Sequence, residues 1–436
     1  MKRLAIVAGH FPPSNLTAVH RARLWAQHLP EFGWEPVIVT THWKYYEEIL
    51  EPELCQLLDP HLEIIHTKAL PTKPFRLVGD IGIRSFYWQL TALKTLAARG
   101  EIQFVHVTIP SNYSALLGGL LYRKYRIPFG IDYIDPWVVE PDRKTGSYLS
   151  KQWLSGKLAT WLEPVAVRNA SLITGVAPLY YEGVLERNPH LRHQCVTAAM
   201  PYGASDKDYD LVAKLSRQPF LFRRGDGLFH MIYAGAMLPN AYAVLERFFQ
   251  ALAMLRDRGA EVMDRLRIHF VGTGRTPTDP KGHNIQPIAR RFGLEHWISE
   301  YPHRMGYLDV LNHLMHASAV LIIGSTEPHY TPSKVFQAVQ AKRPILAVLH
   351  ENSTAVRVLR ESRAGWVVTV TEHRFPEKEE LASVLERFVR DPQYSSEEVG
   401  WEAFREYSAR NSARLLTTAI NCAVERSRVR SEQSCA

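Results

Sequence analysis

The chain has 436 residues and a formal net charge of +8, with 46% hydrophobic and 22% charged residues. This length predicts two or three domains with ordinary soluble cores, and no apolar run approaches the ~20 residues of a membrane span. The four cysteines form no CxxC pair, which argues against a zinc site and predicts free thiols in a reducing cytoplasm. The positive charge favours an anionic partner, and phosphorylated substrates, anionic membranes and nucleic acids all remain open on charge alone.

In the first half of the chain, short apolar runs alternate with amphipathic segments. The apolar run after the N-terminus is too short for a signal peptide and lacks a cleavage site, so it is interpreted as the first strand. Strands are predicted at residues 4–8, 36–40, 62–66, 104–108, 129–133 and 171–175. Helices are predicted at residues 17–29, 81–98, 113–125, 149–169 and 179–187. This alternation predicts a doubly wound parallel sheet.

A polar, turn-rich stretch at residues 201–210 is interpreted as a linker. It contains Asp208 and Asp210 in a D-x-D pattern that some glycosyltransferases use for metal and diphosphate, but it follows no strand and is interpreted as a solvated turn. The predicted domains are therefore residues 1–205 and 206–395, followed by a tail at 396–436.

The second half repeats the alternation of strands and helices. Strands are predicted at residues 229–234, 266–271, 298–301, 319–323, 344–349 and 366–370. Helices are predicted at residues 242–258, 285–292, 307–316, 332–341, 354–361 and 377–390, followed by one long helix at 396–424. The predicted fold is α/β, with two Rossmann-like, doubly wound domains facing across a cleft.

The stretch at residues 318–349 reads as a strand, a loop, a short helix and a second strand. Thr331 suits the N-cap and Pro332 the first helical position. The Ser333 hydroxyl and the Lys334 ammonium then add to free N–H groups, which predicts an anion site at the carboxyl end of a strand. An ordinary crossover with a surface lysine is the alternative, although a cation at a helix N-terminus opposes the dipole and favours an anion nearby.

Several motifs resemble, in order and spacing, those of nucleotide-sugar glycosyltransferases with two Rossmann domains (GT-B), especially the retaining family 4. The motifs are GHFPPS at 9–14, HRAR at 20–23, DYIDPW at 132–137, PYG at 201–203, YAGA at 233–236, VGTG at 271–274, SKVFQA at 333–338 and KRPIL at 342–346. The resemblance covers most of the chain, and it implies that the tail at 396–436 crosses back to the first domain.

This resemblance implies a hexosyltransferase-like enzyme of polysaccharide biosynthesis. It implies transfer of a sugar from a UDP or GDP donor to a carbohydrate or lipid-linked acceptor, with retention of anomeric configuration. No metal, no permanently bound cofactor and no nucleic-acid partner are expected. The implied location is the cytoplasm, with a peripheral position at the inner face of the membrane as one option.

The resemblance also implies roles for individual residues. The catalytic candidates are Lys334, Asp135 and Thr108. The donor-binding candidates are Gly9, Gly235, Gly272, Arg275, Arg304, Met305, Gly306, Glu327, His329, Ser333, Lys334 and Gln337. The acceptor-side candidates are Pro13, Ser14, Asn15, Arg21, Asp132 and Asp135. His106 is interpreted as a hydrogen-bonded core histidine.

The sequence departs from the family pattern at the donor loop. Gln337 stands where a ribose-binding glutamate is expected, His329 stands at the position of the other glutamate, and Glu327 lies two residues earlier. The cationic pair expected after Gly235 is also missing. Two alternatives therefore stay open: a non-catalytic nucleotide-binding protein and a nucleotide-sugar 2-epimerase.

Two basic aromatic stretches, at residues 73–89 and 143–161, have the composition of elements that contact an anionic membrane surface. The alternative for each is a helix that packs its aromatic side chains inward and exposes only its lysines.

Overall fold

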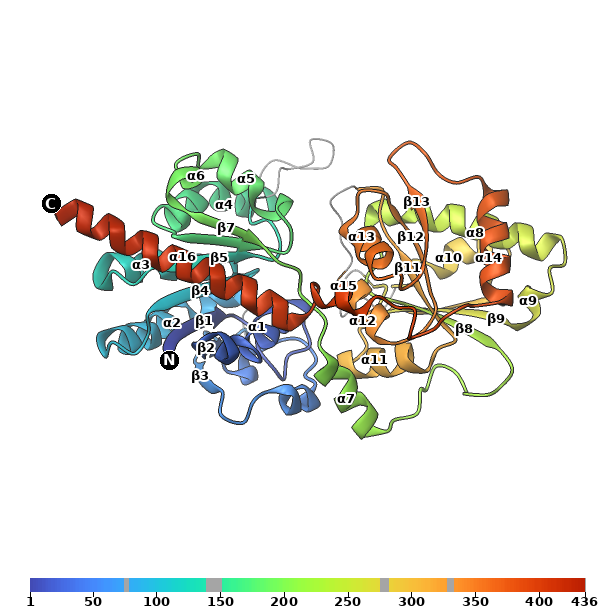
Figure 1. Ribbon diagram of the computed structural model, residues 1–436, viewed down its shortest axis with the longest axis horizontal. Coiled ribbons are helices and arrows are strands. Elements are labelled where there is room, and N and C mark those ends of the chain that lie inside the picture. The colour runs from blue at the N-terminus through green and yellow to red at the C-terminus, as the bar shows by residue number, and fades with distance from the viewer. Residues whose placement is uncertain (74–77, 139–150, 275–281, 328–332, 436) are drawn as a thin grey trace. The chain divides into compact units, whose positions relative to one another are not determined.

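The structure is a computed structural model, which describes residues 1–73, 78–138, 151–274, 282–327 and 333–435. The chain divides into two compact units (Figure 1). Unit 1 comprises Met1–Gly203 together with Ala409–Ala436, and unit 2 comprises Ala204–Ser408. None of the helices in the described part of the chain combines the length and apolarity that a membrane span requires.

Unit 1 is built on a seven-stranded parallel sheet with the order β3-β2-β1-β4-β5-β6-β7. Its strands are β1 (Lys2–Ala8), β2 (Trp34–Thr41), β3 (Glu63–Thr67), β4 (Phe104–Ile109), β5 (Phe129–Tyr133), β6 (Leu172–Gly175) and β7 (Val196–Ala199). Its α-helices are α1 (Thr17–Ala26), α2 (Ile81–Ala98), α3 (Leu116–Tyr125), α4 (Lys151–Val167), α5 (Leu179–Arg187), α6 (Leu191–Gln194) and α16 (Ala409–Cys435).

Helices cover both faces of this sheet, because alternate residues of each strand point to opposite faces. Leu4 and Ile6 of β1 belong to a core cluster with α1 and α16, whereas Ala5 and Val7 belong to a second cluster with α2, α3, α4 and α5. The continuous apolar run of β1 therefore reflects burial on both sides.

Helix α16 is fixed to unit 1 by side-chain hydrogen bonds as well as by packing. The indole N–H of Trp25 donates to Ser412 Oγ at 3.0 Å, and that of Trp34 donates to Asn421 Oδ1 at 3.1 Å. The last helix of the chain is thus part of the N-terminal unit.

Unit 2 is built on a six-stranded parallel sheet with the order β10-β9-β8-β11-β12-β13. Its strands are β8 (Phe229–Ala234), β9 (Leu266–Val271), β10 (Ile298–Tyr301), β11 (Ala319–Ile323), β12 (Ile345–His350) and β13 (Trp366–Val370). Its α-helices are α7 (Asp206–Leu215), α8 (Tyr242–Asp257), α9 (Val262–Arg265), α10 (Gln286–Arg291), α11 (Tyr307–His316), α12 (Lys334–Gln340), α13 (Thr354–Glu361), α14 (Lys378–Arg390) and α15 (Trp401–Arg405). Among the described residues, unit 1 also has the 3₁₀-helices η1 (Leu29–Phe32), η2 (Trp43–Tyr45), η3 (Pro52–Leu57) and η4 (Asn112–Ala115). Unit 2 has the 3₁₀-helix η5 (Pro239–Ala241).

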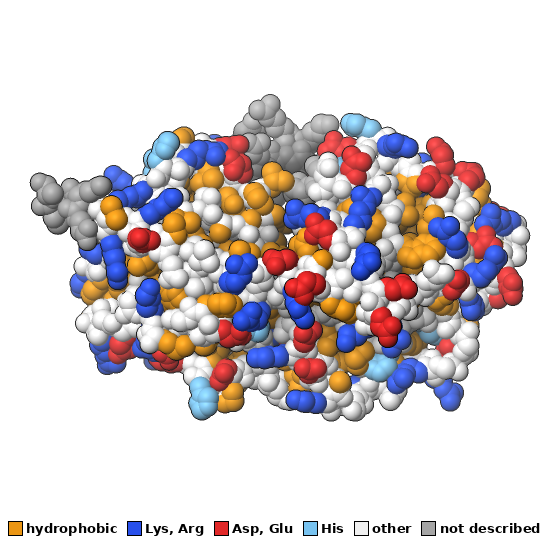
Figure 2. Space-filling model, viewed as in Figure 1, with side chains coloured by type: hydrophobic (Ala, Val, Ile, Leu, Met, Phe, Trp, Pro, Cys, Tyr) orange, Lys and Arg blue, Asp and Glu red, His pale blue; other side chains and the backbone are white. Residues whose placement is uncertain are grey.

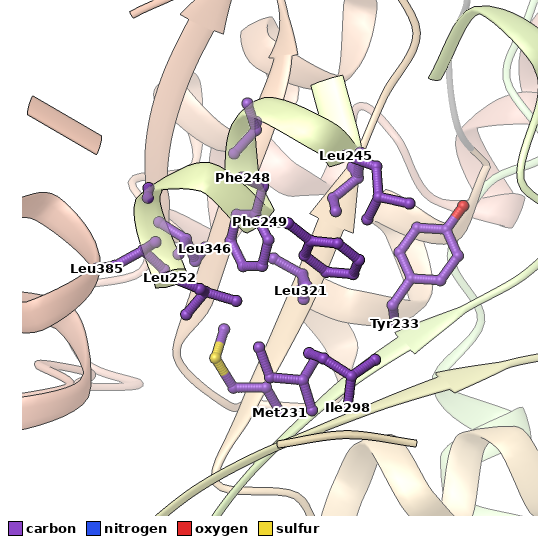
Figure 3. Close-up of a cluster of buried hydrophobic side chains, with 14 of the residues drawn as sticks. Met231, Tyr233, Leu245, Phe248, Phe249, Leu252, Ile298, Leu321, Leu346 and Leu385 are labelled. Atoms are coloured by element: carbon purple, nitrogen blue, oxygen red, sulfur yellow. The ribbon is translucent and has the colours of Figure 1, made fainter. Parts of the chain in front are cut away.

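The main core of unit 2 lies between α8 and the sheet. Figure 3 shows Phe248 and Phe249 of α8 packed against strand residues that include Met231 and Leu321. Tyr233 lies at the edge of this cluster, with its ring among apolar side chains and its hydroxyl at the periphery. The core thereby fixes the end of β8, from which the turn at Gly235 continues.

The predicted α/β fold with two Rossmann-like sheets is confirmed, and three local predictions are wrong. Strand β7 was not predicted, because its residues are only partly buried. The predicted linker contains α7, whose first turn carries Asp206 and Asp208, residues that favour a helix start. The tail predicted as one helix is two, α15 and α16, separated at Tyr407.

Candidate functional site

The carboxyl ends of β8, β9 and β11 form the candidate donor site of unit 2. The chain runs outward from β8 through β9 to β10 and then returns to β11 on the other side of β8. This reversal is a topological switch point, where open α/β sheets bind their ligands. Gly235 follows β8, Gly272 follows β9 and Gly324 follows β11, and the Gly235 N–H donates to the Val271 carbonyl at 2.8 Å.

Lys334, the first residue of α12, directs its ammonium to this switch point. Its Nζ lies 3.7 Å from the centre of the Tyr233 ring, and a Cβ placed on Gly235 would lie 3.3 Å from Nζ. Gly235 also has a φ of 123°, which an L-residue with a side chain rarely adopts. A glycine is therefore needed here for both the backbone conformation and the approach of the ammonium.

The Lys334 ammonium is enclosed, although part of its side-chain stem is accessible. Within the described ranges, Nζ is buried and has no hydrogen-bond partner. Burial lowers the pKa of Lys334 to about 7. The Tyr233 ring face offsets only part of the cost of burying the charge. A buried cation without a counter-charge is the electrostatic feature that an anionic ligand complements.

The other donor-site candidates surround this lysine in the sequence. Ser333 is half-buried, and its hydroxyl caps no N–H of α12. The Ser325 hydroxyl donates to Glu327 at 3.1 Å and accepts from the Glu327 N–H at 3.0 Å, so this carboxylate folds back on its own loop. The backbone carbonyl of the half-buried Gln337 accepts a hydrogen bond from the Tyr209 hydroxyl at 2.7 Å.

The remaining donor-side candidates are the loop after β10 and two residues that the structure does not describe. Arg304, Met305 and Gly306 are half-buried and connect β10 to α11. Arg275 and His329 lie outside the described residues, as do the predicted N-cap and first helical positions before Ser333. In the described residues, helix α12 begins at Lys334.

Glu300 of β10 is a site-supporting residue that the sequence did not indicate. Its buried carboxylate accepts hydrogen bonds from the Thr273 hydroxyl at 2.6 Å and from three backbone N–H groups at the start of α10. It thereby ties the turn after β9 to α10. Since its partners lie 14 to 27 residues away, no local motif could have indicated this role.

Two carboxylates of helix α7 bind neighbouring helices of unit 2: Asp206 contacts α12 and Asp208 contacts α11. Gln340 Nε2 donates to Asp206 Oδ1 at 3.0 Å, and the carboxylate of Asp208 accepts from the Tyr307 hydroxyl at 2.7 Å. Asp208 is 2% exposed, so the interpretation of its D-x-D pattern as a solvated turn is wrong. Among the described residues, no group of three or more His, Cys, Asp or Glu side chains is arranged to hold a metal ion.

In unit 1, the loop after β1 is held by a carboxylate that was also missed. Glu48 Oε1 lies 2.7 Å from His10 Nδ1, and the Ser14 hydroxyl donates to the same oxygen. Burial by itself would raise the pKa of Glu48, but the hydrogen bonds from His10 and Ser14 lower it to about 2. Gly9, at the start of this loop, packs so closely on Ser111 that a Cβ would lie 1.8 Å from its Oγ.

Two acceptor-side candidates, Pro13 and Asn15, are also packed into this loop. Pro13 is half-buried, and its carbonyl accepts from the Glu51 N–H at 2.7 Å. Asn15 is 3% exposed. The loop is thus a well-packed element of unit 1.

Replacing Glu48 by Gln is expected to reduce stability in a pH-dependent way. The folded-state pKa of about 2 lies below that of a free glutamate, ~4.3. Ionised Glu48 therefore stabilises the fold above pH ~4.3, and this contribution is lost as the pH falls towards 2. Urea denaturation should give a free energy of unfolding roughly 3 kcal/mol lower for Glu48→Gln at pH 6, with the difference shrinking below pH ~4. Glu47→Gln, whose side chain is 40% exposed, is the control, and an equal loss in both variants would contradict the assignment.

Arg21 and Asp132, two acceptor-side candidates, form a buried ion pair with each other. The Arg21 guanidinium donates to both carboxylate oxygens of Asp132, at 3.0 and 2.9 Å, and both side chains have 0% exposure. Burial would raise the pKa of Asp132, but the adjacent guanidinium more than offsets this and holds it below its usual value. Arg21 also donates to the carbonyls of Met200 and Pro201, at 2.6 and 2.9 Å.

Thr108, a catalytic candidate, is bonded within the sheet. Its hydroxyl donates to the Val7 carbonyl of the neighbouring strand at 3.1 Å and is buried there. His106 is the buried core histidine that was predicted: its Nε2 lies 3.2 Å from the Thr174 hydroxyl, and burial lowers its pKa to about 4. Asp135 follows β5, and its side chain is exposed.

No family model matches the sequence, and no curated protein sequence shows significant similarity to it. Solved structures do match over nearly the whole chain. Anabaena HepE in complex with UDP-glucose has a TM-score of 0.55 at 14% identity, covering 99% of this chain and 100% of that chain. Sucrose-phosphate synthase from Thermosynechococcus elongatus has a TM-score of 0.54 at 14% identity, covering 100% of both chains.

A third match is a putative UDP-N-acetylglucosamine 2-epimerase from Listeria monocytogenes, with a TM-score of 0.53 at 12% identity, covering 98% of this chain and 97% of that chain. The chain therefore has the GT-B fold that these proteins share.

Proposed function

We propose that the chain is a glycosyltransferase that moves a sugar from a nucleoside diphosphate to a carbohydrate or lipid-linked acceptor, with retention and without a metal. The observation that carries the proposal is the enclosed Lys334 ammonium at the switch point of unit 2, next to Gly235. HepE, which has the same fold, was solved with UDP and with UDP-glucose, so UDP is the first donor nucleotide to test and GDP the second.

The chemistry explains why a preorganised cation belongs at this position. In sugar transfer, the bond from the anomeric carbon to the phosphate oxygen breaks, and the acceptor hydroxyl oxygen forms the new bond. Negative charge grows on the departing diphosphate, and a positioned donor that meets this charge stabilises the transition state. Lys334 is the residue we assign to this charge, while Gln337 and Glu327 are assigned to the ribose.

The acceptor side is assigned to unit 1. Asp135 is the candidate there, because its carboxyl is accessible and follows a strand of the central sheet. We place the enzyme in the cytoplasm, at the inner face of a membrane. Nucleic acid is not a partner in this proposal, since Lys and Arg side chains are mixed with Asp and Glu over the surface that Figure 2 presents.

The direct test is incubation with UDP-glucose and other UDP- and GDP-sugars, with release of the nucleoside diphosphate as the readout. Release that depends on Lys334 supports transfer or slow hydrolysis. The second candidate is a nucleotide-sugar 2-epimerase, which the fold match to the Listeria protein favours. Interconversion of two UDP-sugars without release of UDP would support the epimerase and overturn the transferase. Nucleotide binding with no release and no interconversion would leave a non-catalytic binding protein.

Donor binding should be coupled to proton uptake by Lys334. Free Lys334 has a pKa of about 7, below the ~10.4 of an ordinary lysine, so it is largely neutral above pH 7. A bound diphosphate favours the charged form, so binding takes up a proton and the Kd for UDP should rise by up to about tenfold per pH unit above pH 7. Calorimetry at pH 7, 8 and 9 in buffers of different ionisation enthalpy measures both effects.

Lys334→Arg is the matched control for this pH dependence, because a guanidinium stays charged throughout the range. Its Kd should change much less between pH 7 and 9. A wild-type Kd that is independent of pH over the same range would show that Lys334 does not meet the bound phosphate.

A further inference from the structure

Three helices of unit 1 form a continuous layer on one face of its sheet. Helix α2 packs against α3, and α3 packs against α4, and the inner sides of all three enter one core cluster with the strands (Figure 1). Gly119 of α3 lies beside α4, since a Cβ there would be 3.9 Å from the Ala166 carbonyl, an ordinary van der Waals distance. The outer sides of these helices therefore form one surface of unit 1.

Helix α4 exposes apolar side chains on its outer side. Trp161 is 71% exposed, Leu154 is 63% exposed and Val165 is 46% exposed. They stand at positions i, i+7 and i+11, which lie on one side of an α-helix. The opposite side carries the buried Ala159 and Glu163. Helix α4 thus has a buried inner side and, among the described residues, an outer apolar line that is exposed.

Single exposed apolar residues are ordinary, but an exposed tryptophan in a row with leucine and valine marks an interaction site. Of the two alternatives for this stretch, inward packing of the tryptophans does not apply to Trp161. Trp153, in contrast, is partly buried, and Lys157 Nζ lies 5.8 Å from the centre of its ring.

Cationic side chains border the apolar line. Lys157 and Arg168 are exposed beside it at the helical spacings of Trp161. The last turn of α3 adds the exposed Arg123 and Lys124. The sequences of α2, α3 and α4 contain one acidic residue, Glu163, and its buried carboxylate is paired with Arg187 at 2.8 and 3.0 Å. The outer surface of the three helices is therefore cationic and apolar, with no carboxylate of its own.

We propose that this surface, centred on Leu154, Lys157, Trp161, Val165 and Arg168, docks on an anionic lipid bilayer. Apolar side chains that enter the headgroup boundary, with lysine and arginine at the level of the lipid phosphates, are the arrangement of an interfacial helix. A second copy of the chain is a poorer occupant, because a two-fold interface would bring the same cationic residues against each other. A nucleic acid would satisfy the cations but leave the apolar line exposed.

The test is co-sedimentation of the full chain with vesicles of phosphatidylcholine alone and of phosphatidylcholine with 30% phosphatidylglycerol. We expect binding to the anionic vesicles, little binding to the neutral ones, and weakening as the salt concentration rises. Trp161→Ser combined with Leu154→Ser should reduce the partition coefficient by about tenfold or more. Lys157→Glu combined with Arg168→Glu should reduce it by a similar factor.

Trp43→Ser is the matched control, since Trp43 is 47% exposed on η2 and lies outside the three helices. It should partition like the wild type, and all variants should keep the wild-type melting temperature. The proposal is overturned if the wild type does not bind anionic vesicles, or if the Trp161 and Leu154 variant binds as well as the wild type. It is also overturned if light scattering shows a dimer that this variant dissociates. Because the surface is confined to unit 1, UDP binding by unit 2 is a separate readout.

Discussion

Lys334→Met should lower kcat for sugar transfer by roughly 10²-fold or more, the size of effect seen when one preorganised electrostatic donor is lost. The charge that Lys334 meets grows as the glycosidic bond breaks and is complete in released UDP, so its loss should act on kcat and on UDP binding more than on the donor KM. Methionine keeps an unbranched chain of similar volume, and therefore changes the charge with little loss of packing. Steady-state kinetics with UDP-glucose and an acceptor measure the effect.

The same substitution should not destabilise the free protein. Because Nζ is buried without a hydrogen-bond partner in the described part of the chain, an apolar replacement removes a cost of burial, and the melting temperature should stay the same or rise. Lys378→Ala, in the exposed first turn of α14, is the control and should affect neither activity nor stability. A Lys334→Met protein with full kcat, or with a clearly lower melting temperature, would identify Lys334 as a structural residue.

Asp132→Ala is expected to cost about 3–5 kcal/mol of unfolding free energy, the usual effect of removing one partner of a buried ion pair. It leaves the Arg21 guanidinium enclosed without its bidentate acceptor, in a place where water cannot replace the carboxylate. Chemical denaturation measures the loss. Replacing both residues together by Arg21→Met and Asp132→Leu should restore much of it, because no uncompensated charge then remains.

Glu402→Ala provides the surface control, since Glu402 pairs with Arg405 while its side chain is 87% exposed. Exposed pairs of this kind contribute at most about 1 kcal/mol. If Asp132→Ala instead kept full stability and lost only transfer activity, the residue would belong to the acceptor site after all.

The sequence was sufficient for the fold because buried parallel strands are continuous apolar runs with polar ends. Ala319–Ile323 is wholly buried, and it was predicted to the residue. Val196–Ala199 forms the edge of its sheet with side chains that are only partly buried, so its pattern was too weak. The break at Tyr407 was also not predictable, because it depends on contacts that this residue makes with Phe336 and Glu361 in unit 2.

The candidate site was predictable from the sequence only where its residues lie in one continuous segment. The strand, loop and helix around Lys334 are local, and the prediction of an anion site rested on them. Its neighbour Tyr233 comes from β8, and only the strand order brings the two together. Arg21 and Asp132 have the residue types of a functional pair, but they are 111 residues apart and neutralise each other. Sequence motifs could not distinguish a charge that faces a ligand from one that faces its partner.

The account depends most on the claim that unit 2 binds a nucleoside diphosphate through Lys334. Isothermal titration of the full chain with UDP, GDP and ADP at pH 7 tests this directly, with Lys334→Met titrated in parallel. We expect one-site binding of UDP or GDP by the wild type, weakened by tenfold or more in the variant. Absence of binding of all three nucleotides at millimolar concentration, or equal affinity of the wild type and the variant, would contradict the claim.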